Sequence, residues 1–140
     1  MDLTKSFPRS PVNRSGGIDH LKRMTDKARA HKAGTQGEYI YPCPLDQTLL
    51  GFLGIDPEHF SKALDTQTTD EEVLKWVLEK SATARDPEKI RDFNKTFESR
   101  GPDSPEKWEY FKKTRDAIDP GRIDVTTWAR LIDLEEKRPV

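Results

Sequence analysis

The sequence has few of the features that identify a reaction. Its 140 residues include one cysteine, Cys43, which excludes an internal disulfide and a cysteine-rich zinc site. It contains no glycine-rich phosphate loop, no G-x-S-x-G segment and no H-x-x-x-H or H-E-x-x-H pair. No motif is therefore specific enough to name a chemistry.

Long apolar runs are also missing. No stretch approaches the roughly 20 apolar residues that cross a bilayer, and Met1 to Gly17 lacks the hydrophobic stretch of a secretory signal. We therefore expect a cytoplasmic protein with no membrane partner.

The composition favours lean helices. Hydrophobic residues make up 33% of the chain and charged residues 35%, against a usual charged share of about 25%. Three tryptophans and six phenylalanines supply large apolar anchors, which argues against full disorder. This profile is typical of helices with one apolar stripe and a charged outer face.

Charge is distributed unevenly along the chain, although its net value is −1. Residues 1–32 hold eight basic and three acidic side chains, so the rest of the chain is acidic. A basic first third is compatible with an acidic partner or RNA. We favour a solvated helix face that pairs with the acidic remainder.

Helix start signals recur through the sequence and predict an all-α fold of about six or seven short helices. A capping residue followed by Pro and Glu occurs at 56, 86 and 104, and Thr69 to Glu72 forms a capping box. The predicted helices span about 18–33 and 44–54, then begin near 56, 69, 86, 104 and 126. The 44–54 helix is apolar nearly all round, so we expect it to be central and buried.

The first 17 residues are rich in Pro, Arg, Ser and Gly and predict an extended arm, with Phe7 and Val12 as its anchors. Residues 18–140 are expected to form a single helical domain, with a possible sub-boundary near 101–104. The tetrapeptide at 38–41 is the only strand-like piece.

The segment 37–47 is chemically the densest part of the chain. It places two carboxylates, two phenols and a thiol on a loop that leads into the central helix: Glu38, Asp46, Tyr39, Tyr41 and Cys43. Loops held by a rigid scaffold often carry function. Two phenols on one face of an extended segment are able to stack on a planar ligand, or to cover a core edge.

Cys43 and Asp46 are the candidate catalytic residues. Cys43 falls at the helix N-cap, where the helix dipole favours a negatively charged sulfur. Asp46, one turn away, opposes a second negative charge. Because the two effects are of similar size, we favour a packed, unreactive side chain at Cys43 over a nucleophile. The carboxylate of Asp46 is expected to complement the helix dipole.

The histidines do not predict a metal centre. His20 and His31 are expected on one helix, about 16 Å apart, too far to share one ion. A site assembled from His31, Glu38 and Asp46 is conceivable but not favoured, so we predict neither a metal nor a cofactor. Lys27, Arg29 and His31, with Lys32, are a candidate anion-binding patch that faces the 38–46 loop.

Part of the chain resembles a family of short bacterial proteins known only as a domain of unknown function. The likeness is carried by Asp26 to Ala30, Gly34, Gly37-Glu38-Tyr39, Tyr41, Cys43-Pro44-Leu45-Asp46 and Phe52-Leu53-Gly54. Pro8 to Pro11 and Gly16-Gly17 also resemble the opening of that family, so the likeness covers roughly residues 7 to 80. The resemblance implies a bacterial cytoplasmic domain and supplies no activity, cofactor or partner.

Three functions remain open on the sequence alone. The leading hypothesis is a non-catalytic binding or regulatory module for an unknown small molecule or protein, bound beside Glu38 to Gln47. The second is a small enzyme that uses Cys43 and Asp46 with Tyr39, Tyr41 or His31. The third, nucleic-acid contact through the basic first helix, is the least favoured. A monomer and a homodimer are both compatible with the sequence.

Overall fold

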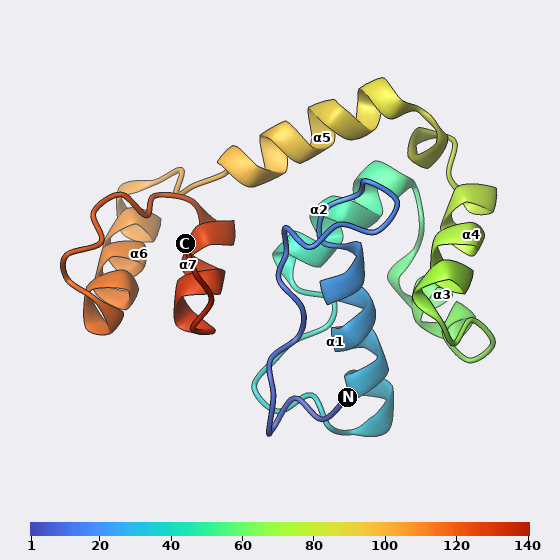
Figure 1. The fold of residues 1–140 in the computed structure, drawn as a ribbon, viewed down its shortest axis with the longest axis horizontal. Coiled ribbons are helices and arrows are strands. Elements are labelled where there is room, and N and C mark those ends of the chain that lie inside the picture. Colours follow the sequence, from blue (N-terminus) through green and yellow to red (C-terminus); the bar gives the residue numbers. More distant parts are fainter. The chain divides into compact units, whose positions relative to one another are not determined.

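The computed structural model describes all 140 residues and confirms the all-α prediction (Figure 1). Seven α-helices and one short 3-10 helix follow one another along the chain: α1 Leu21–Ala33, α2 Pro44–Leu53, α3 Pro57–Ala63, α4 Asp70–Lys80, η1 Thr83–Arg85, α5 Pro87–Ser99, α6 Pro105–Ile118 and α7 Trp128–Glu135. None of these helices is both long and apolar enough to serve as a membrane span.

The helix starts that the sequence predicts near 56, 69, 86 and 104 are confirmed by hydrogen bonds at the caps. The first helix begins at Leu21 rather than near residue 18. Asp56 Oδ1 accepts from the backbone N–H groups of Glu58 at 2.9 Å and His59 at 3.2 Å. Thr69 and Glu72 form the reciprocal capping box at the start of α4. Such bonds satisfy backbone donors that a helix leaves unpaired at its first turn, which is why short helices begin at these positions.

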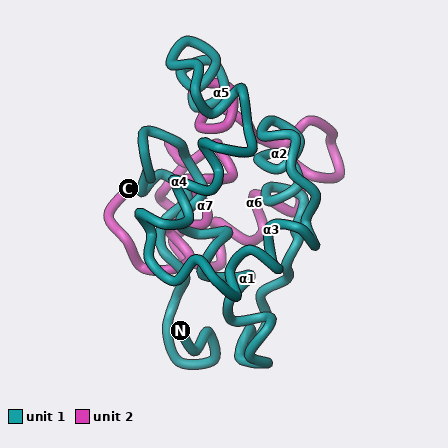
Figure 2. Tube along the Cα trace, turned by 90° about the vertical axis from the view of Figure 1, so that its right-hand side faces the viewer, with its two compact units in different colours: residues 1–94 teal, residues 95–140 magenta.

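The chain divides into two compact units, residues 1–94 and residues 95–140 (Figure 2). The division falls within α5, and Gly101 to Ser104 lies in the second unit as the connection between α5 and α6. Whether residues 18–140 fold as one domain stays a prediction.

The first unit contains the larger core, and α2 contributes to its centre. Leu49, Leu50 and Leu53 are at most 3% exposed, as expected for the apolar 44–54 segment. They belong to one cluster with side chains from α1, α3 and α4, including Leu21, Met24, Ala28, Phe60, Val73 and Val77. The opening polar turn of α2 is thereby fixed against the interior of the unit.

The second unit has a small aromatic core. Phe111, Val125 and Leu131 are buried, and Trp108, Trp128 and Leu134 pack against them. Phe111 lies 5.4 Å from Trp108 and 5.1 Å from Trp128 between ring centroids. These contacts hold α6 against α7.

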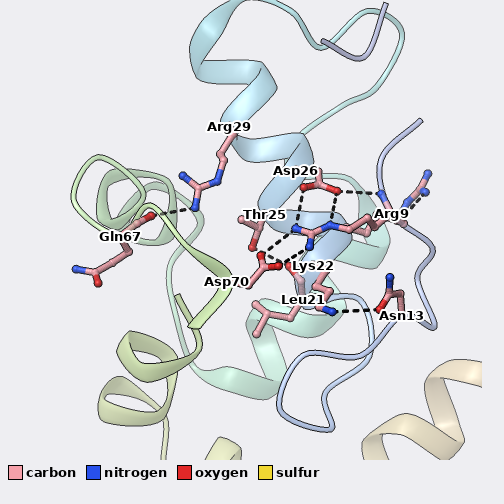
Figure 3. Close-up of polar contacts among 10 residues, drawn as sticks. Arg9, Asn13, Leu21, Lys22, Thr25, Asp26, Arg29, Gln67 and Asp70 are labelled. Carbon is pink, nitrogen blue, oxygen red and sulfur yellow. Dashed lines mark hydrogen bonds and ion pairs between the residues drawn. The ribbon is translucent and has the colours of Figure 1, made fainter. Parts of the chain in front are cut away.

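The N-terminal arm lies along α1 and is held by an ion pair and by the buried residues Leu3, Pro8 and Pro11, not by the anchors that the sequence suggested. Phe7 and Val12 are 44% and 41% exposed, so their predicted role as anchors is wrong. Arg9 instead reaches two carboxylates, Asp26 of α1 and Asp70 of α4 (Figure 3). The Arg9 backbone N–H also donates to Asp26 at 2.9 Å. One guanidinium therefore ties the arm to two helices.

The strand-like segment at 38–41 forms no strand. Its backbone is turn and irregular structure, with the Tyr41 side chain buried and Ile40 67% exposed. The Tyr41–Pro42 peptide bond is cis. The prediction that Tyr39 and Tyr41 share one face of an extended segment is therefore wrong.

Candidate functional site

A buried carboxylate, that of Asp46, joins three other chemically active residues into one cluster. Its Oδ1 accepts a hydrogen bond from His20 Nε2 at 2.7 Å. Its Oδ2 accepts from Lys27 Nζ at 2.8 Å and from the backbone N–H of Cys43 at 2.9 Å. The side chains of His20 and Asp46 have no exposed surface, and that of Lys27 is 4% exposed. We call this group the Asp46 cluster; it fixes the start of α2 to two positions along the α1 segment.

His20 enters the Asp46 cluster as a neutral ring. Burial lowers the pKa of His20, and the nearby positive charge of Lys27 acts in the same direction; both outweigh the opposing influence of Asp46. An ionised carboxylate can only accept hydrogen bonds. The His20 proton therefore sits on Nε2 and is donated to Asp46.

Asp46 is ionised although it is buried. Burial acts to raise its pKa, but the hydrogen bond from His20 and the charge of Lys27 outweigh that cost and lower the pKa to about 2. With one carboxylate, one ammonium and a neutral imidazole, the buried part of the cluster has no net charge. Burial of a matched pair avoids the large desolvation cost of a lone ion.

Cys43 is the member of the Asp46 cluster that reaches solvent. Its side chain is partly exposed, and its Sγ accepts from Lys27 Nζ at 2.9 Å. The residue is the N-cap of α2, as the sequence predicted, with Asp46 at the third helical position completing a capping box. Lys27 thus contacts both the sulfur of Cys43 and the carboxylate of Asp46.

The Asp46 cluster also contains three groups able to ligate a metal. Single donor atoms of His20, Cys43 and Asp46 lie within 4.8 Å of one another, and this combination of nitrogen, sulfur and oxygen suits zinc. However, the ammonium of Lys27 already contacts both the sulfur and the carboxylate. An ion that used all three donors would have to displace Lys27, so the geometry fits an internal ion pair better than a metal centre.

Sequence reasoning missed His20 because it treated the residue as part of the first helix. In the structure His20 precedes α1 and has a left-handed backbone, with φ of 72°. This conformation costs a non-glycine residue about 1–2 kcal/mol. The His20 N–H donates to Pro11 O at 2.7 Å, which stabilises the turn that aims the ring at Asp46. No local pattern signals a partner 26 residues further along the chain.

The remaining predicted site residues do not join Asp46. Arg29 donates to the backbone oxygen of Gln67 at 2.9 Å. The guanidinium of Arg23 lies 5.6 Å from the centre of the Tyr39 ring. The side chains of His31 and Glu38 are exposed, whereas Asp46 is sealed inside. The structure therefore brings Lys27, Cys43 and Asp46 together and leaves Arg29, His31, Glu38 and Tyr39 apart from them.

Tyr41 lies beside a groove of about 330 Å³ on the first unit. The Tyr41 hydroxyl donates to Pro57 O at 2.6 Å, and burial raises the pKa of this phenol above its usual range. The groove combines ring surfaces with a charged rim, and its lining residues are His31, Lys32, Tyr41, Pro42, Pro57, Glu58, Ser61 and Lys62. Of the predicted binding residues, it unites Tyr41 and His31.

At least half of the basic side chains in the first third of the chain are engaged in internal ion pairs. At least four of its eight basic side chains contact carboxylates: Arg9 with Asp26 and Asp70, Arg14 with Asp19, Lys27 with Asp46, and Lys32 with Asp65. These contacts leave less free positive charge for a polyanion than the sequence count alone indicates.

Taken with the fold, these features define an all-helical protein whose first unit is organised around a buried ion pair. The chain belongs to the family described as "Domain of unknown function (DUF5069)", whose model matches residues 5–138. The match confirms membership of a family of unknown function, which the resemblance implied, and it covers nearly the whole chain. No curated protein matches the chain.

Proposed function

We propose that this protein is a non-catalytic binding module that takes a small, ring-containing polar molecule in the groove beside Tyr41. The observation that carries the proposal is the groove itself, which is formed by the end of α1, the Tyr41–Pro42 segment and α3. Its volume of about 330 Å³ lies within the range of small-molecule sites, about 300–1,000 Å³.

The walls of the groove favour a flat or cyclic ligand. The rings of His31 and Tyr41 lie 6.3 Å apart between centroids at a tilt of 53°, and Pro42 and Pro57 add apolar surface. The hydrogen bond from Tyr41 to Pro57 limits movement of the phenol. A wall fixed before binding reduces the entropy lost when a ligand docks.

The rim supplies charges of both signs. Glu58 and Lys62 lie four residues apart on α3, so they occupy one face of that helix. Lys32 is partly engaged, because its Nζ contacts Asp65 at 2.7 Å. A ligand that carries an ammonium and a carboxylate beside its ring would match Glu58 and Lys62 together.

A titration followed by amide resonances tests the proposal with three related probes: benzoate, benzylamine and phenylalanine. We expect phenylalanine to perturb the amides of His31, Tyr41 and Ser61 most, with a Kd of about 1 mM or below, or about −4 kcal/mol. The two probes that carry a single charge should bind more weakly.

The matched variants are Ser61→Trp, which fills the groove, and Ser99→Trp, which adds the same ring at an exposed position of α5. Ser61→Trp should abolish the perturbations and Ser99→Trp should leave them intact. Binding that survives Ser61→Trp, or no groove perturbation by any of the three probes, would refute the proposal.

A second candidate function, thiol chemistry at Cys43, is favoured by one contact. The ammonium of Lys27 lies 2.9 Å from Sγ, and a cation beside a sulfur supports the nucleophilic thiolate form. In the test reaction the sulfur would attack the carbon of iodoacetamide, forming a C–S bond and releasing iodide.

Under this second hypothesis the folded protein should react with iodoacetamide at neutral pH faster than the urea-unfolded chain, and Lys27→Met should slow the reaction. Cys43→Ser provides the blank. Labelling of the folded protein that is slower than that of the unfolded chain would remove Cys43 as a nucleophile.

A further inference from the structure

A second hollow on the first unit lies between the end of the N-terminal arm and the segment that runs from α4 through η1 into α5. Its volume is about 580 Å³, and its lining includes three arginines and no carboxylate side chain. The arginines are Arg14 from the arm, Arg85 from η1 and Arg91 from α5. We call it the arginine hollow.

The arm side of the arginine hollow is held in a fixed shape. Asn94, which is 4% exposed, donates to Gly17 O at 2.7 Å and accepts from the Asp19 N–H at 3.1 Å. Gly16 has φ of +57°, and a Cβ there would lie 2.6 Å from a methyl of Leu74. The left-handed backbone favours glycine here, and a Cβ would force the Leu74 side chain to shift, so this side of the hollow is built by specific contacts.

The arginines are positioned from different elements, and Arg85 and Arg91 present donors to a ligand. Arg85 donates through Nη1 to the carbonyls of Leu78 and Glu79 at the end of α4, which leaves its Nε and Nη2 groups outside those contacts. Arg91 is exposed on α5. Arg14 is partly neutralised, because its Nε donates to Asp19 at 3.0 Å.

The floor of the arginine hollow is apolar, with Leu78, Ala84, Pro87 and Ile90 among its lining residues. The α5 N-terminus adds little, because Asp86 accepts hydrogen bonds from the amides of its first turn. Guanidinium groups above an apolar floor match an anion whose phosphate or carboxylate is attached to a ring or short alkyl group.

We propose that the arginine hollow is a binding site for a small amphipathic oxyanion, separate from the groove beside Tyr41. The apolar part of the ligand would lie on Ile90 and Leu78, and its oxyanion group would accept hydrogen bonds from Arg85 and Arg91. This site does not depend on the function proposed for the groove, because the two hollows share no lining residue.

The test is an amide-resonance titration of the full chain at low salt with phenyl phosphate, benzoate and inorganic phosphate. Phenyl phosphate should perturb Gly16, Gly17 and Ile90 and bind at least about threefold more tightly than inorganic phosphate, because only the former reaches the floor. The comparison with benzoate shows whether phosphate or carboxylate is preferred.

Two variants of α5 separate a built site from general attraction to positive charge. Arg91→Gln should weaken phenyl phosphate binding about fivefold to tenfold, since it removes a charged hydrogen-bond donor. Lys89→Gln removes the same charge from an exposed position outside the hollow and should change the Kd less than about twofold.

Equal weakening by Arg91→Gln and Lys89→Gln, perturbations scattered over the basic surface, or no perturbation at the hollow would overturn the assignment. Circular dichroism of both variants checks that the helices remain folded, so that a lost signal reports on binding alone.

Discussion

Replacing Asp46 with asparagine should be among the most destabilising single substitutions in the first unit. The carboxylate accepts from His20, Lys27 and the Cys43 amide, and an amide side chain offers one accepting oxygen in place of two. The larger loss is electrostatic, because Lys27, 4% exposed, would lose its counter-ion. Removing one partner of a buried ion pair costs about 3–5 kcal/mol.

That magnitude is a large fraction of a typical total stability of about 5–15 kcal/mol. With a urea dependence of about 2 kcal/mol per molar, Asp46→Asn should lower the unfolding midpoint by roughly 1.5–2.5 M. Trp76 packs against the core of the first unit, whereas Trp108 and Trp128 belong to the second. Its fluorescence in a Trp108→Phe, Trp128→Phe background therefore reports on the relevant unit.

The decisive control removes both charges. Asp46→Asn combined with Lys27→Met leaves no unpaired ammonium, so it should regain at least about half of the lost free energy if charge is the cause. A single variant that costs less than about 1 kcal/mol, or a double variant that is no more stable than the single one, would show that Asp46 is not the counter-ion of Lys27.

Further expectations concern pH, the arm and a glycine. The folded-state pKa of His20 and that of Asp46 are both lowered. The contribution of these groups to stability should therefore be full above pH about 6.5 and fall below that value, as the histidine of the unfolded chain takes up a proton. It should fall again from pH about 4 to about 2, where Asp46 is protonated, and urea titrations at several pH values measure both steps. Arg9→Lys cannot span two carboxylates with paired bonds, so it should cost about 1–2 kcal/mol and speed amide exchange in the arm; unchanged exchange would contradict the clamp. Gly16→Ala should lower the free energy of unfolding by about 2 kcal/mol, measured by calorimetry, through backbone strain and contact with Leu74. Gly17→Ala, where an added Cβ meets open space, should lower it less.

Most helix positions were accessible from sequence because their signals are local. Prolines at 44, 57, 87 and 105 stand at the first turn of α2, α3, α5 and α6, where a missing N–H is harmless. Asp56, Asp86 and Ser104, which precede three of these prolines, cap their helices through contacts only two or three residues long. Such short-range chemistry needs no knowledge of the fold.

The candidate site was only partly accessible for the opposite reason. Cys43 and Asp46 could be picked out because they share one helix turn, and Lys27 because it belongs to a basic run. His20 and Arg9 could not. The partner of His20 lies 26 residues away in the chain, and those of Arg9 lie 17 and 61 residues away. Nothing in a linear pattern distinguishes a polar residue that faces solvent from one that meets a counter-ion inside.

Asn94 has a practical consequence for anyone who wishes to study the first unit alone. It anchors the Gly17 and Asp19 backbone, yet it is the last residue of that unit and lies in the middle of α5. A polypeptide cut at the boundary would place this anchor at a fraying helix terminus. A fragment that ends after Ser99 keeps the following turns of the helix and is the better choice for expression.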